Sequence, residues 1–91
     1  MPVSLWVARL LVSDRTRQKI SGRHGITEQE VRDAVELRPG VPYAWDVHPI
    51  RGTRAIASVV IRGRQALVVL YPADDPLGDV YWLGSVYFTN S

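Results

Sequence analysis

Cysteine is absent from this 91-residue sequence, and its absence excludes two common kinds of small protein. Without thiols the chain forms no disulfide scaffold and no thiolate zinc site, so its hydrophobic core must supply the stability of the fold. A reducing compartment fits this composition best. The apolar stretch at residues 1–12 is interrupted by Arg9 and no basic segment precedes it. We therefore expect a cytoplasmic protein with neither a signal peptide nor a membrane span.

The motifs of several familiar catalytic sites are also missing. The seven glycines are scattered along the chain, and none belongs to a phosphate-binding loop. Two histidines and no cysteine leave few ligands for a metal site, and no serine lies in a nucleophile elbow. The sequence thus predicts no metal, no cofactor and no acyl-enzyme chemistry.

The composition is that of a globular chain, with 46% hydrophobic and 22% charged residues. A chain of this length builds one hydrophobic core, so we expect a single domain over residues 1–91. The net charge is only +2, but the charges alternate in blocks. Residues 1–25 and 47–71 are basic, whereas residues 26–46 and 72–91 are acidic. If the two basic blocks meet in space, their joint surface will attract a polyanion.

Two helices are predicted in the first half of the chain. Ser13 is a suitable N-cap for the first helix, and Gly25 is a suitable C-terminal stop. Thr27 and Glu30 have the spacing of a capping box, in which each side chain binds a free backbone amide of the other residue. This box opens the second helix, which we place at residues 28–37.

From Tyr43 onward the hydrophobic pattern has a period of two, which predicts strands. The expected strands are residues 43–47, 53–62, 65–71 and 79–89, while residues 5–12 form a further strand or an N-terminal helix. In the last strand we expect Val80, Trp82, Val86 and Phe88 on one face, and Tyr81, Leu83, Ser85 and Tyr87 on the other. The predicted class is α+β: two short N-terminal helices, with or without a preceding strand, packed on an antiparallel sheet of three to four strands.

The segment from Asp14 to Thr27 is rich in positive charge. Lys19 and Arg23 are four residues apart and share a helix face, and His24 follows them. A histidine with clustered cations can cleave RNA without metal. A base takes the 2′-hydroxyl proton, cations stabilise the phosphorane, and an acid protonates the leaving oxygen. Histidine suits such proton transfer near neutral pH.

Structural roles for the same residues remain open. His24-Gly25 is also typical of a plain helix C-terminus, and the helix cations also suit a solvated face. Arg51 and Arg54 also suit the protection of a sheet edge. The aromatic residues of the last strand, Tyr81, Trp82, Tyr87 and Phe88, equally fit a core or an interface. His48, which precedes a proline, is interpreted as a loop residue without a role.

The order of these residues resembles the BrnT family of bacterial type II toxins, compact ribonucleases related in fold to the RelE group. The resembling positions are Asp14 to Thr27 with Glu30-Val31, then Arg54, Gly63 to Val69, and Trp82 to Ser85. The resemblance implies metal-independent RNA cleavage, inhibition of translation, and neutralisation by a cognate antitoxin that doubles as a DNA-binding repressor. The family continues its last strand with Ser-Ala-Arg and a basic helix, whereas this chain reads Ser85-Val86-Tyr87 and has no Lys or Arg after Arg64.

The matched positions and the charge pattern together give the candidate site. The candidate catalytic residues are His24, Lys19 and Arg54, and Tyr81 or Tyr87 would replace the missing arginine. The candidate nucleic-acid contacts are Arg15, Arg17, Arg23, Arg51 and Arg64. The expected partners are RNA and a cognate antitoxin, with a homodimer as a further possibility. The alternative function is a non-catalytic module that binds protein or nucleic acid.

If His24 is catalytic, the substitution His24→Ala removes RNA cleavage and the toxicity that follows expression, because the proton transfer is lost. Growth after induction and cleavage of a model RNA measure the effect, and circular dichroism checks that the variant folds. Equal toxicity of the two proteins would contradict a catalytic His24.

Overall fold

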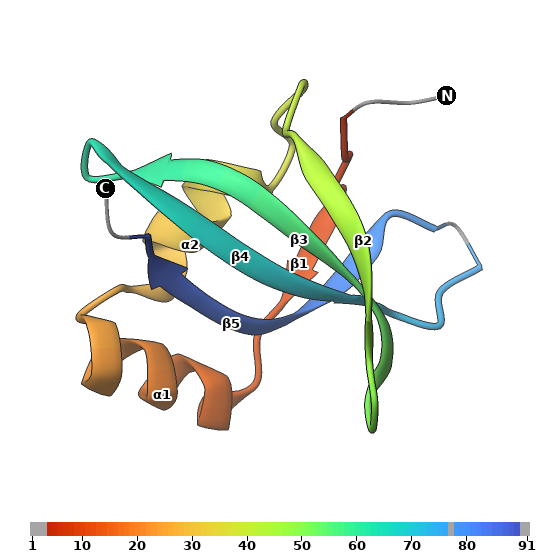
Figure 1. Cartoon of the computed structure of the whole chain (residues 1–91), viewed down its shortest axis with the longest axis horizontal. Helices are drawn as coiled ribbons and strands as arrows, with labels where there is room; N and C mark the ends of the chain where they lie inside the picture. Colours follow the sequence, from red (N-terminus) through yellow and green to blue (C-terminus); the bar gives the residue numbers. More distant parts are fainter. Residues whose placement is uncertain (1–3, 77, 90–91) are drawn as a thin grey trace.

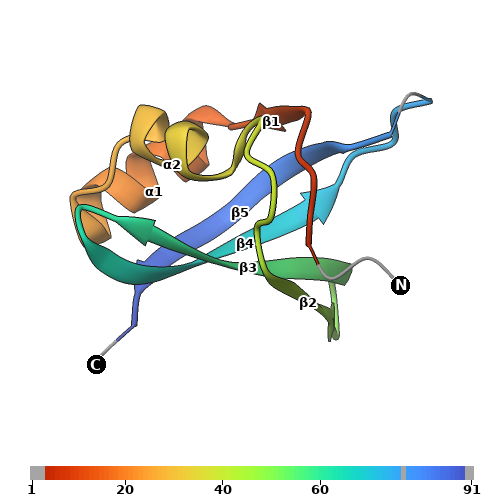
Figure 2. The same ribbon diagram turned by 90° about the horizontal axis from the view of Figure 1, so that it is seen from above.

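The computed structural model describes residues 4–76 and 78–89 of the chain. The elements within these residues are β1 (Arg9–Leu11), α1 (Asp14–His24), α2 (Glu28–Val35), β2 (Tyr43–His48), β3 (Gly52–Ile61), β4 (Arg64–Pro72) and β5 (Val80–Phe88). The strands form one sheet in the order β1-β5-β4-β3-β2 (Figure 1). Both helices lie on one side of this sheet (Figure 2). The predicted α+β class is confirmed.

The sheet has five strands, one more than the upper limit predicted from the sequence, and it is mixed rather than purely antiparallel. The additional strand is β1, which is only three residues long and pairs in parallel with β5. Every other neighbouring pair is antiparallel. A parallel pair requires a crossover connection, and here the chain from β1 to β5 runs through both helices and the three remaining strands.

Both helix starts and the first helix end agree with the sequence prediction. The Ser13 hydroxyl accepts a hydrogen bond from the Thr16 backbone N–H at 3.2 Å, and Gly25 ends α1 with a φ of 63°. The Thr27 and Glu30 capping box is present at the start of α2. However, α2 ends at Val35 rather than at residue 37. Leu37 has a φ of 57° and its N–H donates to the Val7 carbonyl at 2.8 Å, so the chain leaves the helix to pair with the N-terminal segment.

The core lies between the two helices and the face of the sheet that they cover. Apolar side chains of both layers are buried there, and their removal from water is the main source of stability. The helices and the loop between them contribute Ile20, Ile26, Val31 and Val35, and the strands contribute chiefly Leu10, Ala57, Val68, Leu70, Leu83 and Val86.

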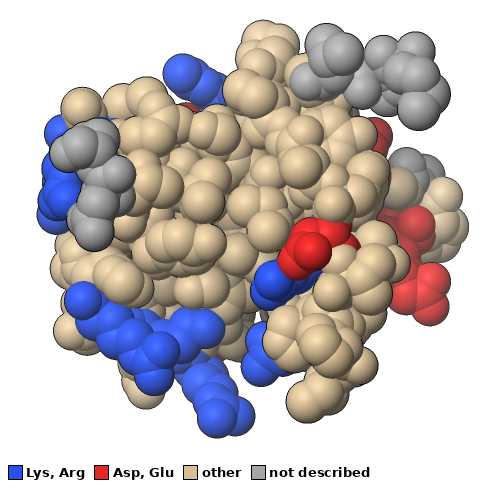
Figure 3. All heavy atoms as spheres, viewed as in Figure 1, with Lys and Arg blue, Asp and Glu red and all other residues tan. Residues whose placement is uncertain are grey.

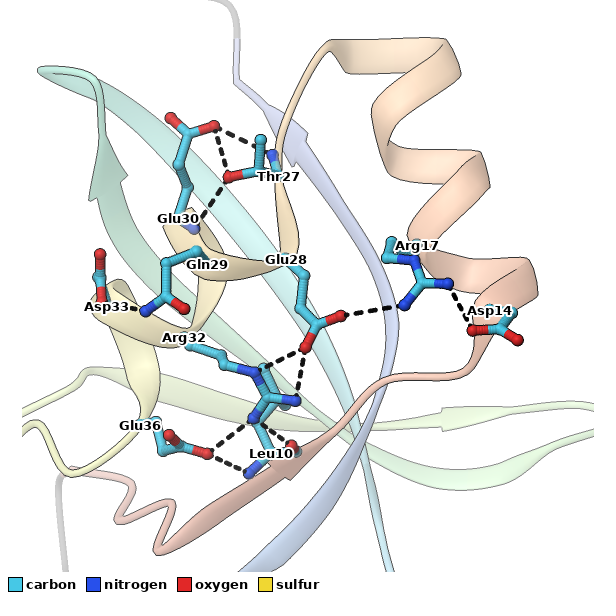
Figure 4. A network of polar contacts seen from close by, with 10 residues as sticks. All are labelled: Leu10, Asp14, Arg17, Thr27, Glu28, Gln29, Glu30, Arg32, Asp33 and Glu36. Atoms are coloured by element: carbon cyan, nitrogen blue, oxygen red, sulfur yellow. Dashed lines mark hydrogen bonds and ion pairs between the residues drawn. The ribbon is translucent and has the colours of Figure 1, made fainter.

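A clamp of charged side chains from α2 covers the outer edge of β1 (Figure 4). The Leu10 N–H donates to Glu36 Oε2 at 2.8 Å, and the Leu10 carbonyl accepts from Arg32 at 2.6 Å. Arg32 also forms ion pairs with Glu36 at 3.0 Å and with Glu28 at 2.8 Å. An edge strand normally leaves such backbone groups to solvent or to another chain. Here α2 satisfies them and fixes its own position on the sheet.

The β3–β4 hairpin is joined to the start of α2 by one arginine. Arg62 and Gly63 have φ angles of 56° and 71°, which suits a two-residue hairpin turn. The Arg62 guanidinium donates to Glu30 Oε2 at 2.6 Å and to the Gly25 carbonyl at 2.5 Å. The hydrogen bond from Arg62, followed by the one from the Thr27 N–H, lowers the pKa of Glu30 to about 2.

Gly84 is the extra residue of a bulge in β5. Val69 pairs with Ser85 and Leu70 pairs with Leu83, so Gly84 has no opposite residue. A bulge shifts the alternation of side chains by one position. For this reason Tyr81 and Leu83 are buried on the same side as Val86, while Trp82 is 46% exposed. The two faces predicted for this strand were therefore wrong on the N-terminal side of Gly84.

The position at the bulge accommodates glycine but no larger residue, because the Tyr71 ring occupies the space of a Cβ atom. A Cβ atom on Gly84 would lie 2.9 Å from Tyr71 Cδ2 and closer still to Cε2, because the tyrosine ring packs over the glycine backbone. The Gly84 carbonyl accepts a hydrogen bond from Lys19 Nζ at 2.7 Å, which ties α1 to β5.

The substitution Gly84→Ala is expected to destabilise the fold by about 1–3 kcal/mol, because the methyl group displaces the Tyr71 ring. Chemical denaturation measures the free energy of unfolding. Gly22→Ala is the matched control, since nothing lies within 4 Å of a Cβ at this helical position, and it should be neutral or stabilising. The cost at Gly84 should also fall in a Tyr71→Ala background. Unchanged stability of Gly84→Ala alone would contradict the packing described.

Candidate nucleic-acid interface

Two adjoining cavities lie near the bulge in β5, one on the open face of the sheet and one lined by residues of α1 and β5. One has a volume of about 600 Å³ and the other of about 700 Å³. Both are lined by Lys19, Arg51, Tyr71 and Gly84, so they meet at the place where α1 is tied to β5. We call the two cavities together the basic groove. The first is also lined by His48, Ile50, Arg54, Ile56, Val69, Ser85 and Tyr87, and the second by Ser13, Arg15, Thr16, Arg23, Trp82 and Leu83.

Lys19 is the only lysine of the chain and sits at the centre of the basic groove. Its ammonium group has a single described hydrogen-bond acceptor, the Gly84 carbonyl. Partial burial, followed by the positive charges of Arg51 and Arg23, lowers the pKa of Lys19 below its ordinary value. The groove therefore holds mutually repelling cations at close range.

Most cations of the groove lack a carboxylate partner. Within residues 4–76 and 78–89, no acidic side chain forms an ion pair with Arg15, Lys19, Arg23 or Arg51. By contrast, Arg32 is paired with two glutamates and Arg62 with Glu30. In Figure 3, which views the open sheet face, the basic side chains gather along the lower side of the molecule. An uncompensated cluster of this kind attracts anions.

Arg54 is the one arginine of the groove that is paired. It lies opposite Asp46 in the β2–β3 ladder, and its guanidinium contacts Asp46 Oδ2 at 2.7 Å. Hydrogen bonds with Asp46 first, and then with Tyr71, raise the pKa of Arg54. This arginine is thus held in a fixed orientation at the wall of the first cavity.

Aromatic rings accompany the cations. The Arg51 guanidinium lies 5.8 Å from the centroid of the Tyr71 ring. Tyr87 is 37% exposed in the first cavity, and Trp82 is 46% exposed in the second. Exposed rings beside cations are the surface on which unpaired nucleic-acid bases stack.

His48 is the last residue of β2, and its ring lines the first cavity. Its Nδ1 atom accepts hydrogen bonds from the backbone N–H groups of Ile50 at 3.1 Å and Arg51 at 3.0 Å. The imidazole therefore shapes the turn that carries Arg51. Sequence reasoning gave this histidine no role, although its place between a strand and a basic turn was a usable signal.

The structure brings together five of the eight cationic or histidine residues predicted for the site. Lys19, Arg54, Arg15, Arg23 and Arg51 line the basic groove. His24, Arg17 and Arg64 do not line it. Arg17 forms ion pairs with Asp14 and Glu28, and Arg64 lies over the Phe88 ring at 4.0 Å. His24 is the last residue of α1, directly before the C-cap Gly25.

Two further properties concern the described part of the chain. It contains no group of three or more His, Cys, Asp or Glu side chains arranged to hold a metal ion. Neither of its helices is long and apolar enough to cross a membrane. Comparison with protein-family models, curated protein sequences and solved structures finds no match for this chain.

The repulsion within the groove predicts that Arg51→Gln raises the pKa of Lys19, because one of the two strongest repelling charges is removed. Since the chain has a single lysine, its Nζ or Cε resonance can be titrated by NMR without ambiguity. Arg38→Gln, which removes a positive charge outside the groove, is the control and should leave the titration unchanged. An identical midpoint in wild type and Arg51→Gln would show that the two cations do not interact.

Proposed function

We propose that this chain is a toxin-like RNA-binding protein that holds the phosphate backbone of RNA in the basic groove. The observation that supports this proposal is the convergence of four cations without carboxylate partners from α1 and the β2–β3 turn. A bound phosphate would relieve their mutual repulsion and replace water around the partly buried Lys19. The binding free energy would come largely from these contacts, as is usual for phosphate backbones.

The exposed rings favour a single strand over a duplex. Tyr87 and Trp82 lie in the two cavities on either side of the cations shared by both. A strand whose phosphate contacts Lys19 and Arg51 could stack one base on each ring. A duplex keeps its bases paired and would make no use of these rings.

Metal-independent cleavage of the bound RNA is the catalytic form of the proposal. In this reaction the 2′-oxygen attacks phosphorus, the bond to the 5′-oxygen breaks, and a proton passes to that oxygen. Burial and neighbouring cations lower the pKa of Lys19, so it gives up a proton more readily than an exposed lysine; in its neutral form it would accept the 2′-hydroxyl proton. Arg51 and Arg54 would stabilise the phosphorane, and the Tyr87 hydroxyl would protonate the leaving oxygen. We assign these proton transfers to groove residues rather than to His24, which does not line it.

Binding of a fluorescent single-stranded RNA at several salt concentrations tests the proposal. We expect affinity to fall steeply with salt, and Arg51→Gln to reduce both the affinity, by about three- to tenfold, and the salt slope, by about one. Arg38→Gln serves as the control of equal charge loss. Absence of RNA binding at low salt would refute the proposal.

Cleavage is assayed separately with excess chelator present. We expect cleavage by the wild type and a loss of about 100-fold or more in Lys19→Met, because general base catalysis contributes about 10²–10⁴-fold. Binding without cleavage by the wild type would favour the alternative, a non-catalytic nucleic-acid-binding module.

A further inference from the structure

The second histidine of the chain, His48, uses one ring nitrogen as a hydrogen-bond acceptor. Nδ1 accepts two backbone hydrogen bonds, from Ile50 and Arg51 at 3.1 Å and 3.0 Å. An acceptor nitrogen carries no hydrogen, so the hydrogen of the neutral ring is on Nε2. Protonation of Nδ1 would place a third N–H against these two donors and break the turn. The turn therefore selects the neutral Nε2–H tautomer.

The other ring nitrogen, Nε2, belongs to a side chain that lines the first cavity. His48 shares the first cavity with Lys19, Arg51 and Arg54. No group in the described ranges accepts a hydrogen bond from Nε2. The neighbouring carboxylate, Asp46, is already bonded to Arg54 at 2.8 Å. Nε2–H is thus a hydrogen-bond donor without an acceptor, beside cations without a counter-ion.

We infer that His48 is an anion-binding residue whose neutral imidazole donates its Nε2–H to a phosphate oxygen of the ligand in the basic groove. This inference rests on the proposed function and adds a residue to it. The donor is uncharged, so it binds the phosphate without adding to the repulsion among the cations. While the turn holds, Nδ1 is occupied by two backbone N–H groups and is not free to accept a proton from the ligand.

Two substitutions separate the two nitrogens of the ring. In His48→Asn the side-chain oxygen can accept the turn's N–H groups in place of Nδ1, as in an Asx-turn, but no group replaces Nε2–H. We expect this variant to fold normally, to keep its cavity, and to bind single-stranded RNA about tenfold more weakly, as for the loss of a hydrogen bond to a charged group. In His48→Gln the longer amide can replace the Nε2 donor but not the acceptor, so the Arg51 backbone amide should lose its protection from hydrogen exchange.

The closing experiment is NMR of the ¹⁵N-labelled ring during titration with inorganic phosphate and, separately, with the RNA. The free protein should show the Nε2–H tautomer, and both ligands should shift Nε2 but leave Nδ1 an acceptor. The opposite tautomer, or wild-type affinity in His48→Asn, would overturn the inference while RNA binding itself stands. Shifts of Nε2 with phosphate, together with no RNA binding at low salt, would instead support the anion site and refute the proposed function.

Discussion

The absence of a side chain at Gly84 is the constraint on which the open face of the sheet depends. The Tyr71 ring occupies the space that a Cβ atom would fill, and the Gly84 carbonyl receives the Lys19 ammonium group at 2.7 Å. The same residue causes the bulge that turns Trp82 outward while Leu83 stays in the core. One glycine therefore sets the position of α1 against β5 and of an aromatic ring against a cation. Gly84 also lines both cavities.

Local signals in the sequence predicted the parts of the fold that local energetics control. Ser13 and Gly25 bounded the first helix correctly. The errors lie where contacts between residues far apart in the sequence determine the structure. Helix α2 stops early because Leu37 bonds to Val7, thirty residues away. The bulge at Gly84 breaks the strict alternation from which the two faces of the last strand were predicted, and the ring of Tyr71 from β4 packs against it.

In the candidate site, too, local patterns predicted some residues correctly, while residues brought together by the fold were missed. Helical spacing was enough to place Lys19 and Arg23 on one face, and the alternation of charge blocks correctly suggested that Arg51 would join them. The choice of histidine was a matter of sequence proximity: His24 follows the helix cations directly but does not line the groove they form. His48 lies 29 residues from Lys19 in the chain, and only the sheet brings the two to one cavity. The hydrophobic periodicity of a sequence does not predict which residues of distant elements line the same cavity.

The parallel pairing of β1 with β5 has a consequence for the order of events during synthesis. β1 emerges from the ribosome first and β5 after every other strand, yet β5 lies between β1 and β4 in the finished sheet. Until it is inserted, Lys19 has no Gly84 carbonyl to bind, and Tyr71 has no surface to pack on. A nascent or truncated chain that lacks residues 80–88 therefore exposes helices and a hairpin but no assembled groove. Any ligand that needs the complete set of cations can be bound only after translation of this chain has passed its last strand.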